Sequence, residues 1–305
     1  MHSKDFSTSV GEVVDLLAQA DAVAVGAGAG LSTAAGLTYS GQRFERLFPD
    51  FIAAYGLRDM YSAGFYPFPS LQERWAYWSR HIWCNRYVQP PKDTYAKLLQ
   101  LLDSRDYFVL TTNVDHQFQS AGFAKERLFY MQGDYGLWQC AEPCHLRTYD
   151  NYDRVRQMVE AQGVRIGVGG EITVPAGGLL MEVPDELVPR CPVCSGPMEM
   201  NLRADSTFVE DAGWHEAAAR YRRFTEAHRG GRVVYMELGV GMNTPGIIKY
   251  PFWRAVHANP EASYVCANLG EAYAPAQIGE RSILIDGDLN VVLDEVSAMV
   301  VGEEH

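Results

Sequence analysis

The sequence lacks any long hydrophobic run. None of its 305 residues lies in a stretch of about 18 consecutive apolar residues, the length typical of a transmembrane helix. The segment Met1–Phe6 lacks the apolar run of a signal peptide. Positive charge is also scarce, since 38 acidic residues outweigh 26 basic ones and give a net charge of −12. Because such a chain repels polyanions on average, we expect a cytoplasmic protein that binds neither membranes nor nucleic acid.

Internal repeats, low-complexity tracts and the Gly-Lys-Ser/Thr of a phosphate-binding P-loop are absent as well. A small basic cluster, Arg220, Arg222 and Arg223, is interpreted as the solvated face of a helix. The hydrophobic content of 47% is sufficient for one large α/β unit with a small inserted module.

Short apolar segments alternate with amphipathic ones along most of the chain. Parallel strands that are buried on both faces usually have this apolar character. We therefore predict a Rossmann-like parallel sheet. The expected strands are 22–25, 107–112, 127–131, 232–238, 263–266 and 282–285, and the expected helices are 10–20, 94–103, 216–228 and 289–301.

A glycine-rich loop, Gly26–Gly36, follows the first expected strand and opens a helix of small residues. Glycines let a ligand approach the backbone closely, and a helix N-terminus attracts phosphate. Its glycines do not match the Gly-x-Gly-x-x-Gly spacing, and such a loop is also common as a plain strand–helix turn. Asn113 and Gln132 follow two further strands. Since ligands bind beyond the carboxyl ends of parallel strands, we expect these three features to share one pocket.

The segment Leu37–Pro91 interrupts the α/β pattern with many aromatic residues. Trp75 and Trp78 are three residues apart and would share one face of a helix. The simpler interpretation is that this pair packs in a core, and the functional alternative is a mobile helical lid over the pocket.

The six cysteines include two close pairs, Cys140 with Cys144 and Cys191 with Cys194. Disulfides are improbable in a cytosolic chain of this size, so the pairs predict a tetrathiolate zinc site. Four thiolates leave no open coordination position, so the zinc would be structural. His145 is a weaker competing ligand. The glycine-rich middle of this insert, 163–178, is predicted to form turns or a β-ribbon.

Together these motifs resemble the sirtuin family over residues 10–300. Gly28–Leu37 is similar to the sirtuin Gly-Ala-Gly-Ile-Ser loop, and Thr111–Asp115 to Thr-Gln-Asn-Ile-Asp, with Thr112 in place of glutamine. Gly239–Gly241 resembles the Gly-Thr-Ser segment. Asn268 and Leu269 resemble the adenosine-binding segment, and 286–293 the adenine-contacting one.

The chain departs from the family at two places. Thr38–Gly41 stands where sirtuins have Pro-Asp-Phe-Arg, and Gln132 stands where they have the catalytic histidine. A glutamine amide does not accept a proton at neutral pH. This combination resembles the macrodomain-linked branch of sirtuins (class M).

That resemblance implies a protein ADP-ribosyltransferase that uses NAD as substrate and releases nicotinamide. It further implies a lipoylated glycine-cleavage H-like carrier as acceptor and a macrodomain hydrolase as a possible partner. The alternatives are a weak NAD-dependent lysine deacylase, with water or His116 replacing the lost base, and a non-catalytic module that senses NAD or ADP-ribose.

The expected organisation has three parts. The NAD-binding domain comprises 1–36, 93–135 and 206–305, the helical insert 37–92, and the zinc module 136–205. Catalytic roles are expected for Asn113 and Gln132. The expected NAD-binding residues are Gly28, Ala29, Gly30, Ser32, Asn113, Asp115, Gln132, Gly239, Gly241, Asn268, Leu269 and Gly287. The expected ligands of one structural Zn²⁺ are Cys140, Cys144, Cys191 and Cys194.

Overall fold

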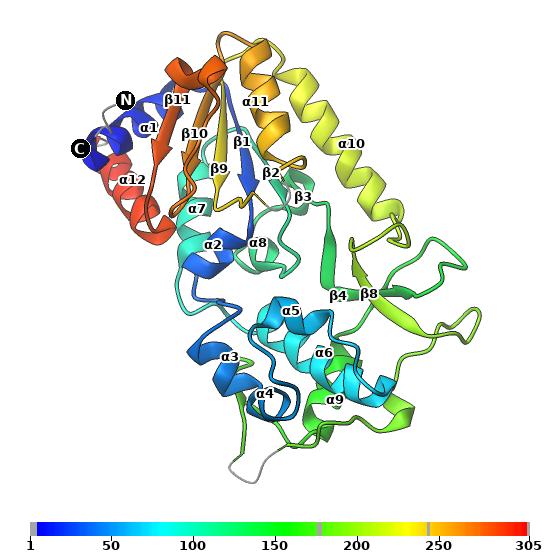
Figure 1. The fold of residues 1–305 in the computed structure, drawn as a ribbon. Helices are drawn as coiled ribbons and strands as arrows, with labels where there is room; N and C mark the ends of the chain where they lie inside the picture. Colours follow the sequence, from blue (N-terminus) through cyan, green and yellow to red (C-terminus); the bar gives the residue numbers. More distant parts are fainter. Residues whose placement is uncertain (1–4, 176–178, 243–244, 304–305) are drawn as a thin grey trace.

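A six-stranded parallel sheet forms the upper lobe of the protein (Figure 1). The computed structural model describes residues 5–175, 179–242 and 245–303, and only the backbone of 301–303. The strand order is β11-β10-β9-β1-β2-β3, which confirms the predicted sheet. The strands are β1 (Ala22–Ala27), β2 (Tyr107–Thr111), β3 (Leu128–Tyr130), β9 (Val233–Leu238), β10 (Ser263–Ala267) and β11 (Ser282–Ile285).

Both faces of the sheet are covered by helices because successive strand side chains point to opposite faces. Val23 and Val25 of β1 lie in one core, whereas Ala24 lies in the other. The first core is covered by α1 (Phe6–Gln19), α2 (Ala29–Ala34), α7 (Thr94–Leu102) and α12 (Leu289–Glu303). The second is covered by α10 (Ala212–Ala227) and α11 (Lys249–Ala258).

The lower lobe (Figure 1) contains a third core, which is rich in aromatic residues. Its helices are α3 (Gln42–Leu47), α4 (Pro49–Tyr55), α5 (Met60–Gly64), α6 (Leu71–Arg86) and α9 (Tyr152–Ala161). Trp75 and Trp78 are only 1% and 7% exposed, so the core interpretation of this pair is confirmed. Trp75 meets Trp138 edge-on, with ring centroids 5.0 Å apart. The two predicted inserts therefore share one hydrophobic core.

Two small antiparallel sheets complete the lower lobe. One joins β5 (Tyr149–Asp150), β4 (Gly133–Cys140) and β8 (Met198–Leu202) in that order. The other is the ribbon of β6 (Arg165–Ile166) and β7 (Ile172–Thr173), which lies in the glycine-rich segment as predicted. Positions 176–178 of that segment lie outside the described residues, as do 1–4 of the N-terminal segment. The short elements α8 (Gln117–Ser120), η1 (Lys125–Arg127), η2 (Asp185–Leu187) and η3 (Ala276–Arg281) lie in connections.

Element boundaries differ from the prediction mainly at helix starts. The helix predicted from 216 begins at Ala212, because Asp211 caps it by accepting a hydrogen bond from the Trp214 amide at 2.9 Å. The helix predicted from 10 begins at Phe6. Helix α9 was not predicted. Within the described ranges, no helix is both long and apolar enough to cross a membrane.

Candidate NAD site and zinc centre

Three of the predicted site segments follow strands that are neighbours in the sheet. The glycine loop follows β1, residues 112–115 follow β2, and residues 239–242 follow β9. Since β1 lies between β9 and β2 and all three run parallel, these segments meet at one edge of the sheet. In Figure 1 this edge faces the lower lobe, with α2 and α8 below the strand ends.

The glycines at this edge let two backbone segments lie in direct contact. A Cβ on Gly30 would lie 2.7 Å from the Gly239 Cα, and a Cβ on Gly28 would lie 2.7 Å from the Gly239 carbonyl oxygen. Gly239 has φ +60°, a conformation that favours glycine. The Gly28 and Gly30 amides donate to the carbonyls of Leu238 and Gly239 at 3.0 and 2.9 Å. These glycines therefore join the β1–α2 turn to the end of β9.

Ser32, Asn113 and Asp115 form one buried hydrogen-bond network with Tyr95. The Ser32 hydroxyl donates to the Asp115 carboxylate at 2.5 Å, so the contact of 2.7 Å between Ser32 and Tyr95 must use the tyrosine proton. The Asn113 side-chain amide donates to the Gly28 carbonyl at 3.0 Å and to Ser32 Oγ at 3.1 Å. The network fixes the segment after β2 against the glycine loop.

Burial dominates the electrostatics of this network. It raises the pKa of Asp115 to about 6, although hydrogen bonds from Ser32 and the Gln117 amide act in the opposite direction. Burial also raises the pKa of Tyr95 well above its usual value. At neutral pH the Asp115 side chain is therefore a carboxylate and the Tyr95 side chain a neutral phenol, and both are hydrogen-bonded to Ser32 of the glycine loop.

Gln132 follows β3 and is half-buried. The backbone carbonyl of Gln132 accepts a hydrogen bond from the backbone amide of Arg203 at 3.0 Å. The backbone carbonyl of the preceding residue, Met131, accepts one from the Trp214 indole at 3.0 Å. The next residue, Gly133, has φ +100°, and a Cβ there would lie 1.8 Å from the Asn201 carbonyl oxygen. The backbone around Gln132 is therefore held in place, while its side-chain amide makes no hydrogen bond among the described residues.

His116, the weaker candidate for a base, belongs to a separate cluster. Its Nδ1 lies 2.5 Å from the Asp134 carboxylate, which also accepts from Arg86 Nε at 2.7 Å. Burial raises the pKa of Asp134, but the His116 hydrogen bond and the Arg86 charge outweigh it, so the net shift is downward. The cluster ties the segment after β2 to β4 and α6, which gives His116 a structural role.

The predicted adenine-binding residues lie at the ends of β10 and β11. The Asn268 side chain donates to the Val240 carbonyl at 3.0 Å, which leaves its own carbonyl oxygen as an acceptor. The Gly270 amide donates to Asp286 at 2.6 Å. Leu269 is 71% exposed, and a Cβ at Gly287 would meet other atoms only at 3.7 Å. A Cβ on Gly241 would lie 3.7 Å from the Glu271 carboxylate.

Several tyrosines at the site were not predicted from the sequence. Tyr95 lies in α7, whose pattern is that of an ordinary amphipathic helix. Tyr39 and Tyr135 come from segments far apart in the chain, and their hydroxyls meet at 2.9 Å. The sequence offered one signal for them. A tyrosine that the hydrophobic pattern places in the core needs a hydrogen-bond partner for its hydroxyl.

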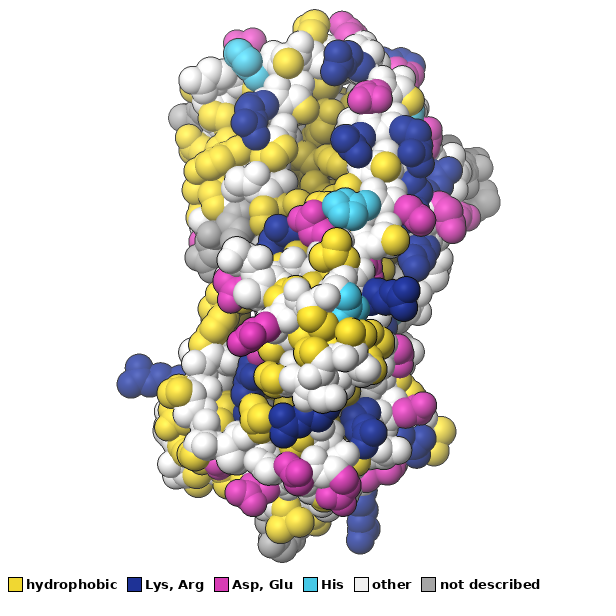
Figure 2. Space-filling view, turned by 90° about the vertical axis from the view of Figure 1, so that its right-hand side faces the viewer, with side chains coloured by type: hydrophobic (Ala, Val, Ile, Leu, Met, Phe, Trp, Pro, Cys, Tyr) yellow, Lys and Arg dark blue, Asp and Glu magenta, His cyan; other side chains and the backbone are white. Residues whose placement is uncertain are grey.

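The arginines of α10 lie on a face with mixed charge. Figure 2 shows basic and acidic side chains interspersed there. Arg220 lies 3.9 Å from Glu216, and Arg222 and Arg223 are exposed. This agrees with their interpretation as a solvated helix face.

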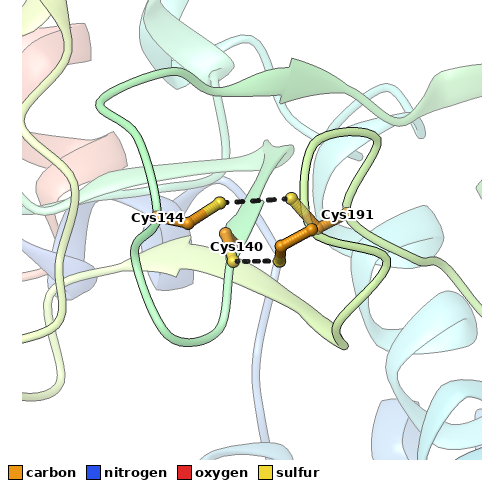
Figure 3. A group of neighbouring side chains, drawn as sticks. Cys140, Cys144 and Cys191 are labelled. Carbon is orange, nitrogen blue, oxygen red and sulfur yellow. Dashed lines mark hydrogen bonds between the residues drawn. The ribbon is translucent and has the colours of Figure 1, made fainter.

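The four predicted cysteines converge on one point. In Figure 3, Cys140 and Cys144 lie on one side of the cluster and Cys191 lies on the loop that faces them. The sulfur atoms of Cys140, Cys144, Cys191 and Cys194 all lie within 4.8 Å of one another. The Cys140–Cys194 and Cys144–Cys191 sulfurs are 3.6 and 3.7 Å apart. A tetrahedron with zinc–sulfur bonds of about 2.3 Å has edges of about 3.8 Å, so the cluster suits one structural Zn²⁺.

His145 is not part of this cluster. Its Nδ1 lies 3.0 Å from the Cys144 sulfur, and its Nε2 is hydrogen-bonded to the Tyr149 hydroxyl at 2.8 Å. The four thiols complete a tetrahedral set without it. Since Cys140 ends β4 and Gly133 begins it, the metal would fix the strand that carries the Gln132 loop.

Solved structures share this fold. The chain matches Sir2Tm bound to a propionylated peptide with a TM-score of 0.54 and 18% identity, over 97% of this chain and 98% of that one. It matches a Sir2–p53 peptide–NAD+ complex with a TM-score of 0.55 and 17% identity, over 96% and 98%. At such identities the likeness establishes the fold alone, which is that of the sirtuins.

Two curated proteins are similar in sequence, although no family model matches. The protein ADP-ribosyltransferase of Staphylococcus aureus (strain Mu50 / ATCC 700699) is 39% identical over 276 residues, covering 90% of this chain and 82% of that protein. A probable bifunctional ADP-ribose hydrolase/ADP-ribosyltransferase of Fusarium oxysporum f. sp. cubense is 35% identical over 246 residues, covering 77% of this chain and 38% of that protein. The chain therefore belongs to the sirtuin-like protein ADP-ribosyltransferases, which use NAD.

Proposed function

We propose that this enzyme transfers the ADP-ribose of NAD to a lipoylated glycine-cleavage H-like carrier protein. The observation that carries the proposal is Gln132, whose amide stands where sirtuins have a basic histidine. An amide does not take the proton that deacylation requires, but it orients a ribose by hydrogen bonding. The similarity to the staphylococcal transferase supports the same reaction class.

NAD would lie along the carboxyl edge of the sheet. Its phosphates would meet the loop Gly28–Ser32, where the amide of Ala29 donates to no described backbone group. Its adenosine would extend towards Gly241, Asn268, Leu269 and Gly287, and its nicotinamide ribose towards Asn113, Asp115 and Gln132. The order of β11, β10, β9, β1 and β2 in the sheet supports this direction.

In the proposed reaction the bond between C1′ of the ribose and the nicotinamide nitrogen breaks. The bonding electron pair goes to the ring nitrogen and neutralises its positive charge. A nucleophile of the acceptor then forms a new bond to C1′ and loses its proton to solvent. Asn113 and Gln132 act by holding the ribose, so catalysis rests on positioning and fixed dipoles.

A cavity next to the residue that follows Gln132 supports an acceptor with an apolar arm. It measures about 210 Å³, borders Gly133, and has Phe129, Leu137 and Trp214 among its lining residues. Apolar walls with a few polar groups suit a chain of methylene groups such as a lipoyl arm. The fungal relative, named for both ADP-ribose hydrolase and transferase activity, supports a functional link to a macrodomain hydrolase.

The test is incubation of the zinc-loaded enzyme with NAD labelled in the adenylate phosphate. Lipoylated carrier, unlipoylated carrier and an acyl-lysine peptide are offered separately. We expect label only on the lipoylated carrier, and we expect free lipoamide to compete with it. Labelled acyl-ADP-ribose would instead identify a deacylase, and bound but unconsumed NAD would identify a sensing module. Label on both carrier forms would refute the role of the lipoyl arm.

A further inference from the structure

A chain of hydrogen bonds runs from the interior of α6 to the edge of the candidate NAD site. His81 Nδ1 lies 3.3 Å from the Tyr77 hydroxyl, and His81 Nε2 lies 2.9 Å from the Tyr135 hydroxyl. The Tyr135 hydroxyl in turn meets the Tyr39 hydroxyl at 2.9 Å. Tyr77 and His81 are buried in α6, Tyr135 is buried in β4, and Tyr39 is half-buried. The chain therefore ends at Tyr39.

The direction of each proton in this chain follows from its first member. Tyr77 donates its one proton to the Met60 carbonyl at 3.0 Å, so its oxygen accepts from His81 Nδ1–H. Burial lowers the pKa of His81 to about 3, so the ring is neutral and its Nε2 accepts. Tyr135 must then donate to His81, and Tyr39 must donate to Tyr135.

This polarity leaves the Tyr39 oxygen as an acceptor without a proton to offer. Burial raises the pKa of both Tyr39 and Tyr135, so neither phenol ionises at neutral pH. The neighbouring Asp115 carboxylate raises the pKa of Tyr39 further. Each oxygen of Asp115 already accepts one hydrogen bond, one from Ser32 and the other from the Gln117 amide, and each keeps a further lone pair. Tyr39 thus adds a neutral acceptor oxygen beside this carboxylate.

The sheet order indicates which part of NAD lies near Tyr39. With the adenosine at β10 and β11 and the phosphates at β1, the far end of the ligand points towards β2. Asp115 follows β2, and Tyr39 lies close enough for its charge to act on the phenol. The nicotinamide ring is the group of NAD beyond the ribose at that end, and its carboxamide carries an N–H₂ donor.

We propose that Tyr39 selects the carboxamide of NAD by accepting a hydrogen bond from its N–H, with Tyr135 and His81 directing the tyrosine proton away. Tyr39 is the contacting residue, and Tyr135 is a positioning residue. The inference rests on the proposed function, since it places NAD in the same site. It adds a selectivity for an amide donor over an isosteric ketone.

The test compares three ligands by calorimetry on the zinc-loaded enzyme: NAD, its 3-acetylpyridine analogue and ADP-ribose. The analogue keeps the carbonyl but replaces the amide NH₂ with a methyl group. We expect the wild type to bind NAD about fivefold more tightly than the analogue, the effect of one neutral hydrogen bond. Tyr39→Phe should remove this preference and leave ADP-ribose affinity unchanged. Tyr135→Phe should reduce the preference, because it frees the Tyr39 proton to rotate.

Tyr55→Phe is the matched control, since its hydroxyl bonds to Glu73 outside the chain of hydrogen bonds. It should keep the wild-type preference. Equal loss of NAD and ADP-ribose affinity in Tyr39→Phe would overturn the proposal, as would a preference that Tyr39→Phe leaves intact. If the folded wild type bound neither NAD nor ADP-ribose, the proposed function itself would fail, which is a distinguishable result.

Discussion

Gly30 and Gly239 lie back to back, with the ideal Cβ position of Gly30 only 2.7 Å from the Gly239 Cα. The contact joins the β1–α2 turn to the end of β9. A Cβ on Gly30 would meet the backbone of Gly239, which cannot move aside as the end of a flexible side chain can. The requirement for glycine at position 30 therefore comes from the fold before any ligand binds. An aspartate there would disturb the fold as well as repel phosphate.

The first prediction concerns this contact. Gly30→Ala should lower the free energy of unfolding by about 1–3 kcal/mol, the usual cost of forcing a methyl group into a packed region. Gly11→Ala is the control, because a Cβ at Gly11 meets nothing within 4 Å and the residue lies inside helix α1. Denaturant titration should show that the control is neutral or stabilised by about 0.5–1 kcal/mol. Equal effects of the two substitutions would contradict the packing argument.

The second prediction follows from the pKa of Asp115, which burial raises from 3.8 to about 6. Below pH 4 both folded and unfolded states hold the proton, so the shift has no effect on stability. Between about pH 4 and 6 the unfolded state loses its proton first, so rising pH destabilises the wild type, by roughly 3 kcal/mol in total. Asp115→Asn removes this loss. Unfolding titrations at several pH values should show the variant gaining stability relative to wild type up to pH 6, then a constant difference. A difference independent of pH would contradict the raised pKa.

The third prediction concerns the four-cysteine cluster. Cys191→Ser should lower the bound zinc well below one ion per chain and reduce the melting temperature, because metal binding contributes folding free energy. The Gln132 loop should lose order with it, since β4 begins at Gly133 and ends at Cys140. Metal analysis and thermal unfolding are the measurements. Cys84→Ser, at a buried thiol outside the cluster, should keep the full zinc content; loss of zinc in both variants would argue against a specific site.

The strands were predictable because each is a short apolar run bounded by polar residues or glycine. β1 and β9 differ from the expected limits by at most two residues. Because the strands were expected to be parallel, the sequence also predicted that Asn113 and the glycine loop lie at one edge of the sheet. Helix α9 escaped prediction because half of its residues are polar, and only Val155, Met158 and Val159 are buried. The division of the chain into three parts stays a prediction.

The contacts that shape the site were less accessible from sequence. Tyr39 meets Tyr135 across a separation of 96 positions, and no local pattern pairs them. His116 and Asp134 are 18 positions apart, and no local pattern pairs them either. The sequence therefore allowed His116 as a candidate base. Their pairing depends on the register between the segment after β2 and strand β4, which the tertiary structure sets.

The central claim is that Asn113 and Gln132 position the ribose of NAD and move no proton. The most direct measurement is nicotinamide release and label transfer by Asn113→Ala, Gln132→Ala, Gln132→His and His116→Ala. Asn113→Ala should lose about 10²-fold in rate, as expected for one oriented hydrogen-bonding group, because the Asn113 side-chain carbonyl oxygen is free to accept from a ribose hydroxyl while its N–H groups bind Gly28 and Ser32. Gln132→Ala should also be slower, and His116→Ala should stay close to wild type. Gln132→His should not deacylate an acyl-lysine peptide, although a base with its partners in place is worth about 10²–10⁴-fold. Robust deacylation by Gln132→His, or inactivity of His116→Ala alone, would contradict the account.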